Sequence, residues 1–270
     1  MKKLLKLVLV LMMSISVVGC GNSNAISLDG STSMEKLVNA LKETVAQECG
    51  LNLEPQFTGS STGLQSLISG NADIANSSRA LKQEEKDQGL VENIVAIDGI
   101  AVIVDKSNSV ISLSRQQLID IYTGKIKNWK ELGGSDQAIV VVGREASSGT
   151  RGAFEEILDI KGLCQYSNEL NETGAVVAKV GQTKGAIGYV SFDVVEDNLD
   201  TINTVALDGV NITKENIVNN TYTLTRPFVM ATKGTIDQQS EQVQQLFEFI
   251  YSEQGTEVIE HVGLVAISQE

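Results

Sequence analysis

Apolar residues recur along the chain with two spacings, which predict helices and strands in alternation. Residues 33–48 place Met34, Leu37, Leu41 and Val45 on one side, the spacing of an amphipathic helix. The same criterion predicts further helices at 63–69, 149–158, 175–182 and 237–251 and from Ser114. Alternating or continuous apolar runs predict strands at 25–28, 51–57, 72–75, 91–104, 138–142, 186–190 and 227–231. This alternation of strands and helices predicts an α/β fold.

The first residues have a different pattern, which predicts export. Lys2, Lys3 and Lys6 precede the apolar run 7–18, which is shorter than the roughly 20 residues that a membrane-spanning helix needs. Residues 1–19 are therefore predicted to be a signal peptide. Because Cys20 follows small residues at the end of this run, as in the bacterial lipobox, we expect a lipid on its sulfur. An ordinary signal peptide followed by an incidental cysteine is the alternative.

The length of the remaining chain predicts two lobes. Removal of residues 1–19 leaves 251 of 270 residues, a size at which chains divide into domains. No low-complexity linker separates two halves, so the chain is expected to cross between them in ordered strands, with 100–104 and 226–230 as candidates. The predicted organisation is a tether at 20–25, lobe I at 26–103 and 227–270, and lobe II at 104–226.

Charge and composition exclude several functions. The 21 basic residues less Lys2, Lys3 and Lys6 leave 18 against 34 acids, a net charge of −16, so no nucleic-acid partner is expected. With His261 as the sole histidine, no metal site or cofactor is predicted. Cys49 and Cys164 are expected to be isolated buried thiols, although their spacing does not settle whether they pair. Nothing in the sequence indicates an oligomer, and we expect a monomer.

Four turns rich in serine, threonine and glycine could together hold an anion. They are residues 30–33, 59–63, 76–79 and 147–150, and all but the third precede a predicted helix. A helix start presents unpaired N–H groups and attracts anions, and Arg79 and Arg144 lie beside two of the turns. Ser and Thr are also ordinary helix caps, which is the simpler explanation of any single turn. Because turns at the carboxyl ends of strands meet in one crevice, four together predict a tetrahedral oxyanion site.

These turns also carry a resemblance to a known family. Residues 29–33, 59–63, 72–79 and 143–151, with 122–124, 128–129 and 185–189, match in order and spacing the phosphate-binding lipoproteins of the high-affinity phosphate ABC importer (PstS family). The resemblance implies a type II periplasmic-binding-protein fold, in which two hinge strands join two lobes. It also implies inorganic phosphate between the lobes and a membrane permease and ATPase as partners.

The resemblance assigns phosphate-binding roles to individual residues, and it expects no catalytic ones. The binding residues are Thr32, Ser33, Ser60, Ser78, Arg144, Ser148, Gly149 and Thr150, with Ser31, Ser61, Arg79 and Arg151 as further candidates. Arg79 and Arg151 could instead pair with Asp73 or Glu145 and hold a turn in shape.

Ser78 departs from the family pattern, since some members have an aspartate there that accepts the phosphate proton and repels sulfate. Asp73, Glu145 or a backbone carbonyl is expected to replace that acceptor.

Three other functions remain open. The chain could bind another oxyanion, such as sulfate, molybdate or a phosphonate, or it could be a phosphate-sensing lobe. Residues 59–63 also fit the G-x-S-x-G motif of serine hydrolases, with Ser61 as nucleophile, but His261 is the only histidine that could serve as its base.

Overall fold

A mixed sheet of eleven strands runs through the whole molecule. The computed structural model describes residues 25–267, so the predicted signal peptide and Cys20 lie outside the described residues. The main path of the sheet is β2-β1-β3-β12-β5-β9-β7-β8; β10 and β13 pair with β5, and β4 pairs with β12. The strands are β1 Ala25–Gly30, β2 Asn52–Gln56, β3 Ile74–Ser77, β4 Leu90–Val91, β5 Ile94–Asp105, β7 Val140–Arg144, β8 Asn168–Leu170, β9 Ala186–Ser191, β10 Ile202–Thr204, β12 Thr225–Lys233 and β13 Val265–Ala266. A separate pair is formed by β6 Ser112–Leu113 and β11 Ala206–Leu207.

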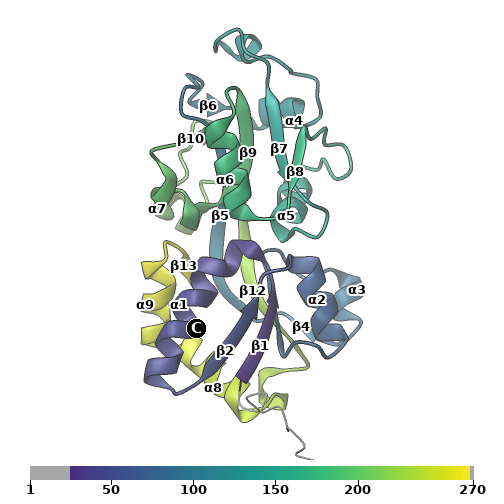
Figure 1. The fold of residues 1–270 in the computed structure, drawn as a ribbon, viewed down its shortest axis with the longest axis vertical. Coiled ribbons are helices and arrows are strands. Elements are labelled where there is room, and N and C mark those ends of the chain that lie inside the picture. The colour runs from purple at the N-terminus through teal and green to yellow at the C-terminus, as the bar shows by residue number, and fades with distance from the viewer. Residues whose placement is uncertain (1–24, 268–270) are drawn as a thin grey trace, which may run out of the picture.

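Helices cover the sheet in two groups, which define two lobes (Figure 1). Lobe I contains β1–β4 and β13 with α1 Glu35–Glu48, α2 Ser60–Ile68, α3 Gln83–Lys86, α8 Glu241–Ile250 and α9 Glu253–His261. Lobe II contains β6–β11 with α4 Arg115–Tyr122, α5 Gly149–Ile157, α6 Thr173–Gln182 and α7 Lys214–Val218. Short 3-10 helices occupy Thr32–Met34, Trp129–Leu132, Phe192–Val194, Glu196–Asn198 and Ile236–Gln238. The predicted α/β, two-lobed type II fold is confirmed.

Two strands, β5 and β12, cross between the lobes side by side. They pair antiparallel with Thr225 opposite Gly99 and Arg226 opposite Asp98. The apolar core of lobe I reaches Ala96 on β5, and the core of lobe II begins at Ile100. The lobes therefore have separate cores but share one sheet, and their exact boundaries stay a prediction.

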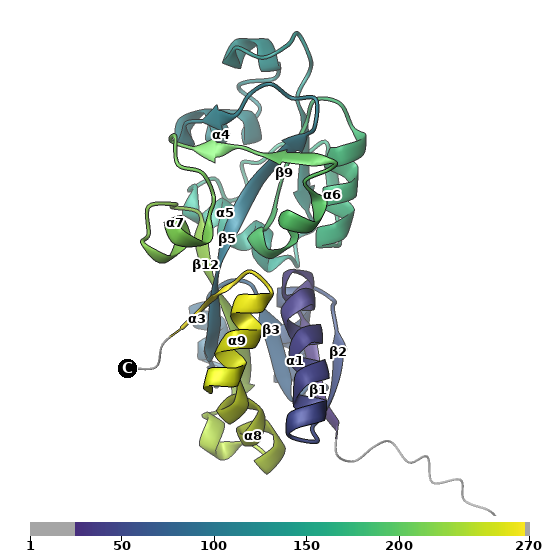
Figure 2. The ribbon, with the colours of Figure 1, turned by 90° about the vertical axis from the view of Figure 1, so that its left-hand side faces the viewer.

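Each lobe packs helices on both faces of its part of the sheet. In lobe I, α1, α8 and α9 lie together on one face, where they stand in front of the strands in Figure 2, and α2 covers the other face. In lobe II, neighbouring residues of β9 face opposite ways. Gly188 faces α6, where a Cβ would lie 2.9 Å from Val180 Cγ2, while Tyr189 stacks on Phe154 of α5 with ring centroids 4.2 Å apart.

Two helix predictions need correction. The helix expected at 237–251 is interrupted, because Gln239 is extended and the hydroxyl of Ser240 accepts a hydrogen bond from Val243 N, which starts a new helix at α8. The helix expected from Gly63 begins at Ser60, since Gly59 takes a φ of 100° and ends the preceding extended segment there. This earlier start brings Ser60 and Ser61 into the first turn of α2.

The thiols are more exposed than expected. Cys49 packs against the core of lobe I and Cys164 against that of lobe II, and both are free and only half-buried. Burial still raises the pKa of Cys164 to about 11, because its effect is larger than that of the hydrogen bond with Tyr166, which lowers this pKa.

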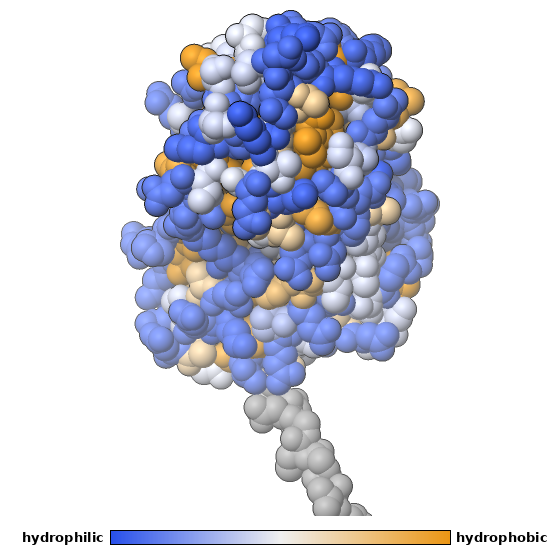
Figure 3. All heavy atoms as spheres, turned by 45° about the horizontal axis from the view of Figure 1, so that its top comes forward, coloured by the Kyte–Doolittle hydropathy of each residue, from blue (hydrophilic) through white to orange (hydrophobic). Residues whose placement is uncertain are grey.

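The helices and one face of the surface of residues 25–267 can be judged by their polarity. Within that range, every helix is too short or too polar to span a bilayer. Figure 3 shows a face covered mostly by hydrophilic residues, with apolar ones in small patches.

Candidate functional site

The four hydroxyl-rich turns lie where the two lobes meet. β1 pairs parallel with both β2 and β3, so the turns that follow these strands lie at one edge of the lobe I sheet. Backbone hydrogen bonds join them: Ser31 N donates to Asn76 O at 2.8 Å and Gly59 N donates to Gly30 O at 2.8 Å. The fourth turn follows β7 of lobe II and meets them from the other side, where Ser61 N donates to Ser147 O at 3.0 Å.

Three serines of lobe I form one hydrogen-bonded group. Ser31 Oγ donates to Ser78 Oγ at 2.8 Å, and Ser78 N donates to Ser60 Oγ at 3.1 Å. The hydroxyls of Ser60 and Ser78 are 3.4 Å apart. All three side chains are buried. Lobe I thus presents clustered hydroxyls, which donate hydrogen bonds without carrying charge.

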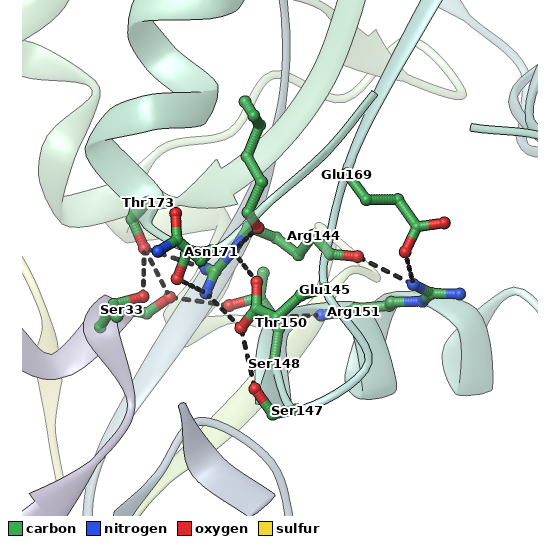
Figure 4. A network of polar contacts seen from close by, with 12 residues as sticks. Ser33, Arg144, Glu145, Ser147, Ser148, Thr150, Arg151, Glu169, Asn171 and Thr173 are labelled. Atoms are coloured by element: carbon green, nitrogen blue, oxygen red, sulfur yellow. Dashed lines mark hydrogen bonds and ion pairs between the residues drawn. The ribbon is translucent and has the colours of Figure 1, made fainter. Parts of the chain in front are cut away.

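Arg144 provides the positive charge from lobe II. It ends β7, is 2% exposed, and is fixed by Glu145, whose carboxylate accepts from Nε and Nη2 at 3.1 Å each. The carbonyls of Leu170 and Asn171 also accept from Nε and Nη2, both at 3.1 Å. Its Nη1 instead reaches Thr173 Oγ1 at 3.3 Å, at the boundary between the lobes. The guanidinium is therefore held on one side and directed to the site on the other (Figure 4).

Hydroxyls of the two lobes are in direct contact. Ser33 Oγ lies 2.7 Å from Thr150 Oγ1 and 3.2 Å from Thr173 Oγ1, which is also 3.2 Å from Thr32 Oγ1. At Gly149 a Cβ would lie 2.2 Å from Ser60 Oγ and 2.7 Å from Ser78 Oγ, so only glycine permits this approach.

The structure brings together all eight residues expected to bind phosphate, and all are buried: Thr32, Ser33, Ser60, Ser78, Arg144, Ser148, Gly149 and Thr150. The lobes are closed over the site.

Helix capping accounts for only part of this hydroxyl cluster. Ser31 caps the 3-10 helix at Thr32–Met34 and Ser148 caps α5. Neither Ser60 nor Thr150 is a cap, and α2 begins after Gly59, which has no side chain to offer. No side chain therefore caps the first turn of α2. Ser61 N in that turn donates to Ser147 O, which leaves the N–H groups of Ser60 and Thr62 for an anion beside Ser78.

The other two arginine candidates are engaged elsewhere. Arg79 makes a two-pronged ion pair with Glu85 at 2.7 and 2.8 Å and reaches Ser61 Oγ at 3.3 Å. Burial alone would raise the pKa of Glu85, but hydrogen bonds from Arg79 and the Lys82 backbone outweigh it and lower that pKa.

Arg151 binds Glu155 at 2.8 Å and Glu169 at 2.7 Å, and also donates to Arg144 O. Both arginines hold turns in shape as expected, but the predicted partners, Asp73 and Glu145, are wrong.

Asp73 is also wrong as the acceptor that replaces an aspartate at position 78. It precedes β3, at the end opposite Ser78, and accepts from Ser27 N at 2.8 Å and Ser27 Oγ at 2.6 Å. Glu145 is occupied by Arg144 and by Ser147 Oγ. The hydrogen-bond partners of Ser78 Oγ are instead the hydroxyls of Ser31 and Ser60.

A buried ion pair that no sequence motif indicated contacts the backbone of Ser78. Arg226 of β12 donates from Nη1 to Ser78 O at 3.2 Å and from Nε to Asp98 Oδ2 at 2.8 Å. Asp98 Oδ1 accepts from Phe192 N of lobe II at 3.1 Å. Burial raises the pKa of Asp98 although Arg226 lowers it, and burial lowers the pKa of Arg226. Asp98 is the single charged residue in the apolar run 94–104, and this was the available signal, since a buried charge needs a partner.

A second buried carboxylate lies beside this pair. Burial, and then the charge of Asp98, raise the pKa of Asp193 to about 7. Its two carboxylate oxygens have no hydrogen-bond partner among the described residues. Lys36 of lobe I donates to the Asp193 carbonyl at 2.9 Å and pairs with Asp197 at 2.7 Å, which joins the lobes at this point.

The geometry does not assemble a hydrolase. His261 ends α9, whereas Ser61 lies in the first turn of α2, on the opposite face of the lobe I sheet. Among residues 25–267 there is also no cluster of side chains suited to a metal ion.

Comparison with known proteins agrees with this architecture. Residues 20–254 match the model of the PBP superfamily domain. The phosphate-binding protein PstS of Bacillus subtilis is 34% identical over 216 residues, which cover 78% of this chain and 71% of the relative. The phosphate-binding protein PstS of Borreliella burgdorferi is 28% identical over 284 residues, or 99% of each.

Solved structures show the same relationship. A Clostridium perfringens protein solved with bound phosphate, and assigned to a phosphate ABC transporter, superposes with a TM-score of 0.86 at 38% identity, covering 91% of this chain and all of that one. An ABC-type phosphate transport receptor from Vibrio cholerae gives 0.74 at 33% identity, covering 90% and 100%. By fold and by sequence, the chain belongs to the PstS family of phosphate-binding proteins.

Proposed function

We propose that this protein captures inorganic phosphate between its lobes and delivers it to an ABC importer. The observation that carries the proposal is the enclosed group of hydroxyls around Arg144, contributed by both lobes and in contact across them. Its relatives are named phosphate-binding proteins, and the Clostridium perfringens structure contains phosphate.

The site suits phosphate because its donors are numerous and mostly neutral. The hydroxyls of Thr32, Ser33, Ser60, Ser78 and Thr150 and the helix starts of α2 and α5 surround the ligand oxygens. Arg144 contributes one full positive charge through Nη1, the nitrogen that is not committed to Glu145. Burial strengthens each of these hydrogen bonds, since water no longer competes for them.

Capture and delivery require only opening and closing of the lobes. In the open form water fills the cleft; phosphate then links donors of lobe I to Arg144 of lobe II and stabilises the closed form. No covalent step is needed. A lipid on Cys20 would keep the protein beside its permease and ATPase partners outside the membrane.

Calorimetric titration of the purified protein with phosphate, arsenate and sulfate tests this proposal. Arg144→Ala is expected to weaken phosphate binding by about 10- to 150-fold, since a charge-assisted hydrogen bond contributes about 1.5–3 kcal/mol. Arg115→Ala, at the start of α4 in the same lobe, is the control and should bind like the unmodified protein.

Sulfate bound as tightly as phosphate would point instead to a general oxyanion carrier. If the unmodified protein gives no heat with phosphate, the proposed function is wrong.

A further inference from the structure

Thr173 occupies the point at which the two lobes and Arg144 meet, although neither the hydroxyl-rich turns nor the resemblance includes it. It is the first residue of α6, the ten-residue helix that follows β8. Its Oγ1 lies 3.2 Å from Thr32 Oγ1, 3.2 Å from Ser33 Oγ and 3.3 Å from Arg144 Nη1. Each of these three groups belongs to a residue of the proposed phosphate site, and Figure 4 shows Thr173 between Ser33 and Arg144. Thr173 itself is 4% exposed.

The hydrogen-bonding capacity of one hydroxyl explains what these contacts mean. A threonine hydroxyl has one proton to donate and two lone pairs to accept with. Arg144 can only donate to it, so Thr173 accepts there and shares its remaining capacity with Thr32 and Ser33. In the closed protein, Thr173 Oγ1 is therefore surrounded by the donors that a phosphate oxygen would use.

Thr173 is not accounted for as a helix cap. The N-cap of α6 is Glu172, whose side chain makes no capping hydrogen bond, and the first internal bond of the helix runs from Val176 N to Glu172 O. The N–H groups of residues 173–175 precede that bond, so they form the uncapped positive end of the helix. The hydroxyl that meets Arg144 and Ser33 thus projects from a helix start, as at α2.

We propose that Thr173 is a further phosphate-contacting residue, which donates its hydroxyl proton to the ligand oxygen that Thr32, Ser33 and Arg144 also bind. The inference rests on the proposed function. When phosphate enters, Arg144 and the one hydroxyl of Thr32 and Ser33 that donates to Thr173 turn their protons to the ligand. The Thr173 proton, which the other hydroxyl accepts before phosphate binds, is released to do the same. α6 then joins α2 and α5 as a helix that begins at the anion.

Two substitutions at one position test the role of the hydroxyl. Thr173→Val keeps the shape and removes the hydroxyl, whereas Thr173→Ser keeps the hydroxyl and removes the methyl group. Thr183→Val, at the other end of α6, is the matched control. Phosphate titration is expected to give about a tenfold higher Kd for Thr173→Val, and a Kd within about twofold of the unmodified protein for Thr173→Ser and Thr183→Val.

The outcomes separate this inference from the proposed function. If the unmodified protein binds phosphate and Thr173→Val binds it equally well, Thr173 does not contact the ligand, and the proposed function is unaffected. If Ser and Val weaken binding alike, the side chain acts by packing and the inference is wrong. Absence of phosphate binding by the unmodified protein overturns both. Thermal melting of each variant shows whether it is folded at the temperature of the titration. If Thr173→Val is unfolded there, the affinities of Thr173→Ser and Thr183→Val still decide. A Thr173→Ser variant that binds phosphate tenfold more weakly contradicts the inference.

Discussion

Gly149 allows the lobes to close because it has no side chain. Its Cα faces the hydroxyls of Ser60 and Ser78, both buried in lobe I. Gly59 has a similar position on the other side, where a Cβ would lie 2.6 Å from Ser147 Oγ. Contact at these two glycines is between backbone and hydroxyl groups. The N–H of Gly149 can therefore come close to a small anion, whereas that of Gly59 is bonded to Gly30 O.

Replacing Gly149 should therefore obstruct closure without unfolding the protein. In Gly149→Ala the new methyl group overlaps Ser60 Oγ and Ser78 Oγ, and phosphate affinity should fall at least tenfold in a calorimetric titration. Gly152→Ala is the control on the same helix, because its Cβ meets only the flexible Arg79 side chain, at 3.3 Å. An equal loss in both variants would show that α5 itself, and not the contact, is damaged.

At the level of residues, the sequence revealed the groups that occur in motifs and missed those that occur singly. Ser60 and Ser148 lie in hydroxyl-rich turns beside predicted helices, a pattern that local chemistry can interpret. Thr173 is one threonine between Glu172 and Gly174, and nothing local distinguishes it. Its role depends on the packing of α6 against β9 and on the position of lobe I, which local patterns do not contain.

At the level of elements, the two strands that cross between the lobes carry a buried ion pair. β5 and β12 bring Asp98 and Arg226 together in the sheet, and their ion pair is almost fully buried. A continuous apolar run predicted β5 well, since period and length suffice for a buried strand. The partner of Asp98 could not be predicted, because the pairing of strands 128 residues apart is a property of the whole sheet.

Replacing one member of this ion pair should destabilise the protein more than replacing both. Arg226→Met leaves Asp98 buried without its partner and should lower the free energy of unfolding by about 3–5 kcal/mol. Asp98→Asn combined with Arg226→Met should recover part of that loss. Urea denaturation measures both, with Lys161→Met as an exposed control. If the single variant is as stable as the unmodified protein, the pair does not stabilise the hinge.

At the level of the molecule, closure buries charge as well as ligand. Asp193 of lobe II lies beside Asp98, Ser191 and Arg226, and Lys36 of lobe I holds its backbone. Length and the lack of a linker predicted two lobes correctly. The closed arrangement could not be predicted, because contacts such as Ser33 with Thr150 depend on how two separate cores are oriented.

Asp193 should make stability depend on pH in a defined direction. Its pKa is raised from 3.8 to about 7, so between these values the folded protein holds a proton that the unfolded chain has lost. The contribution is therefore most favourable below pH 4, declines as pH rises to about 7, and is constant above that, with a slope on the order of 1 kcal/mol per pH unit.

Asp193→Asn removes this contribution. Urea denaturation from pH 4 to pH 8 measures the free energy of unfolding of the unmodified protein and of Asp193→Asn. With rising pH, the free energy of unfolding of the unmodified protein should fall relative to that of Asp193→Asn. A difference that does not change with pH would mean that the carboxyl is solvated in the folded protein.

The sheet that continues through both lobes also affects how much conformational entropy is lost when the ligand binds. Ile100 N of β5 donates to Leu224 O at 2.7 Å beside the crossing, so the segments that join the lobes are already hydrogen-bonded and ordered. In a protein whose domains are joined by a flexible tether, part of the binding free energy is offset by the conformational entropy lost when the tether is ordered. Here that loss occurs once, during folding. Each cycle of capture and release can then repeat with a small entropic cost, and more of the affinity of the hydroxyls for the anion remains available for holding it.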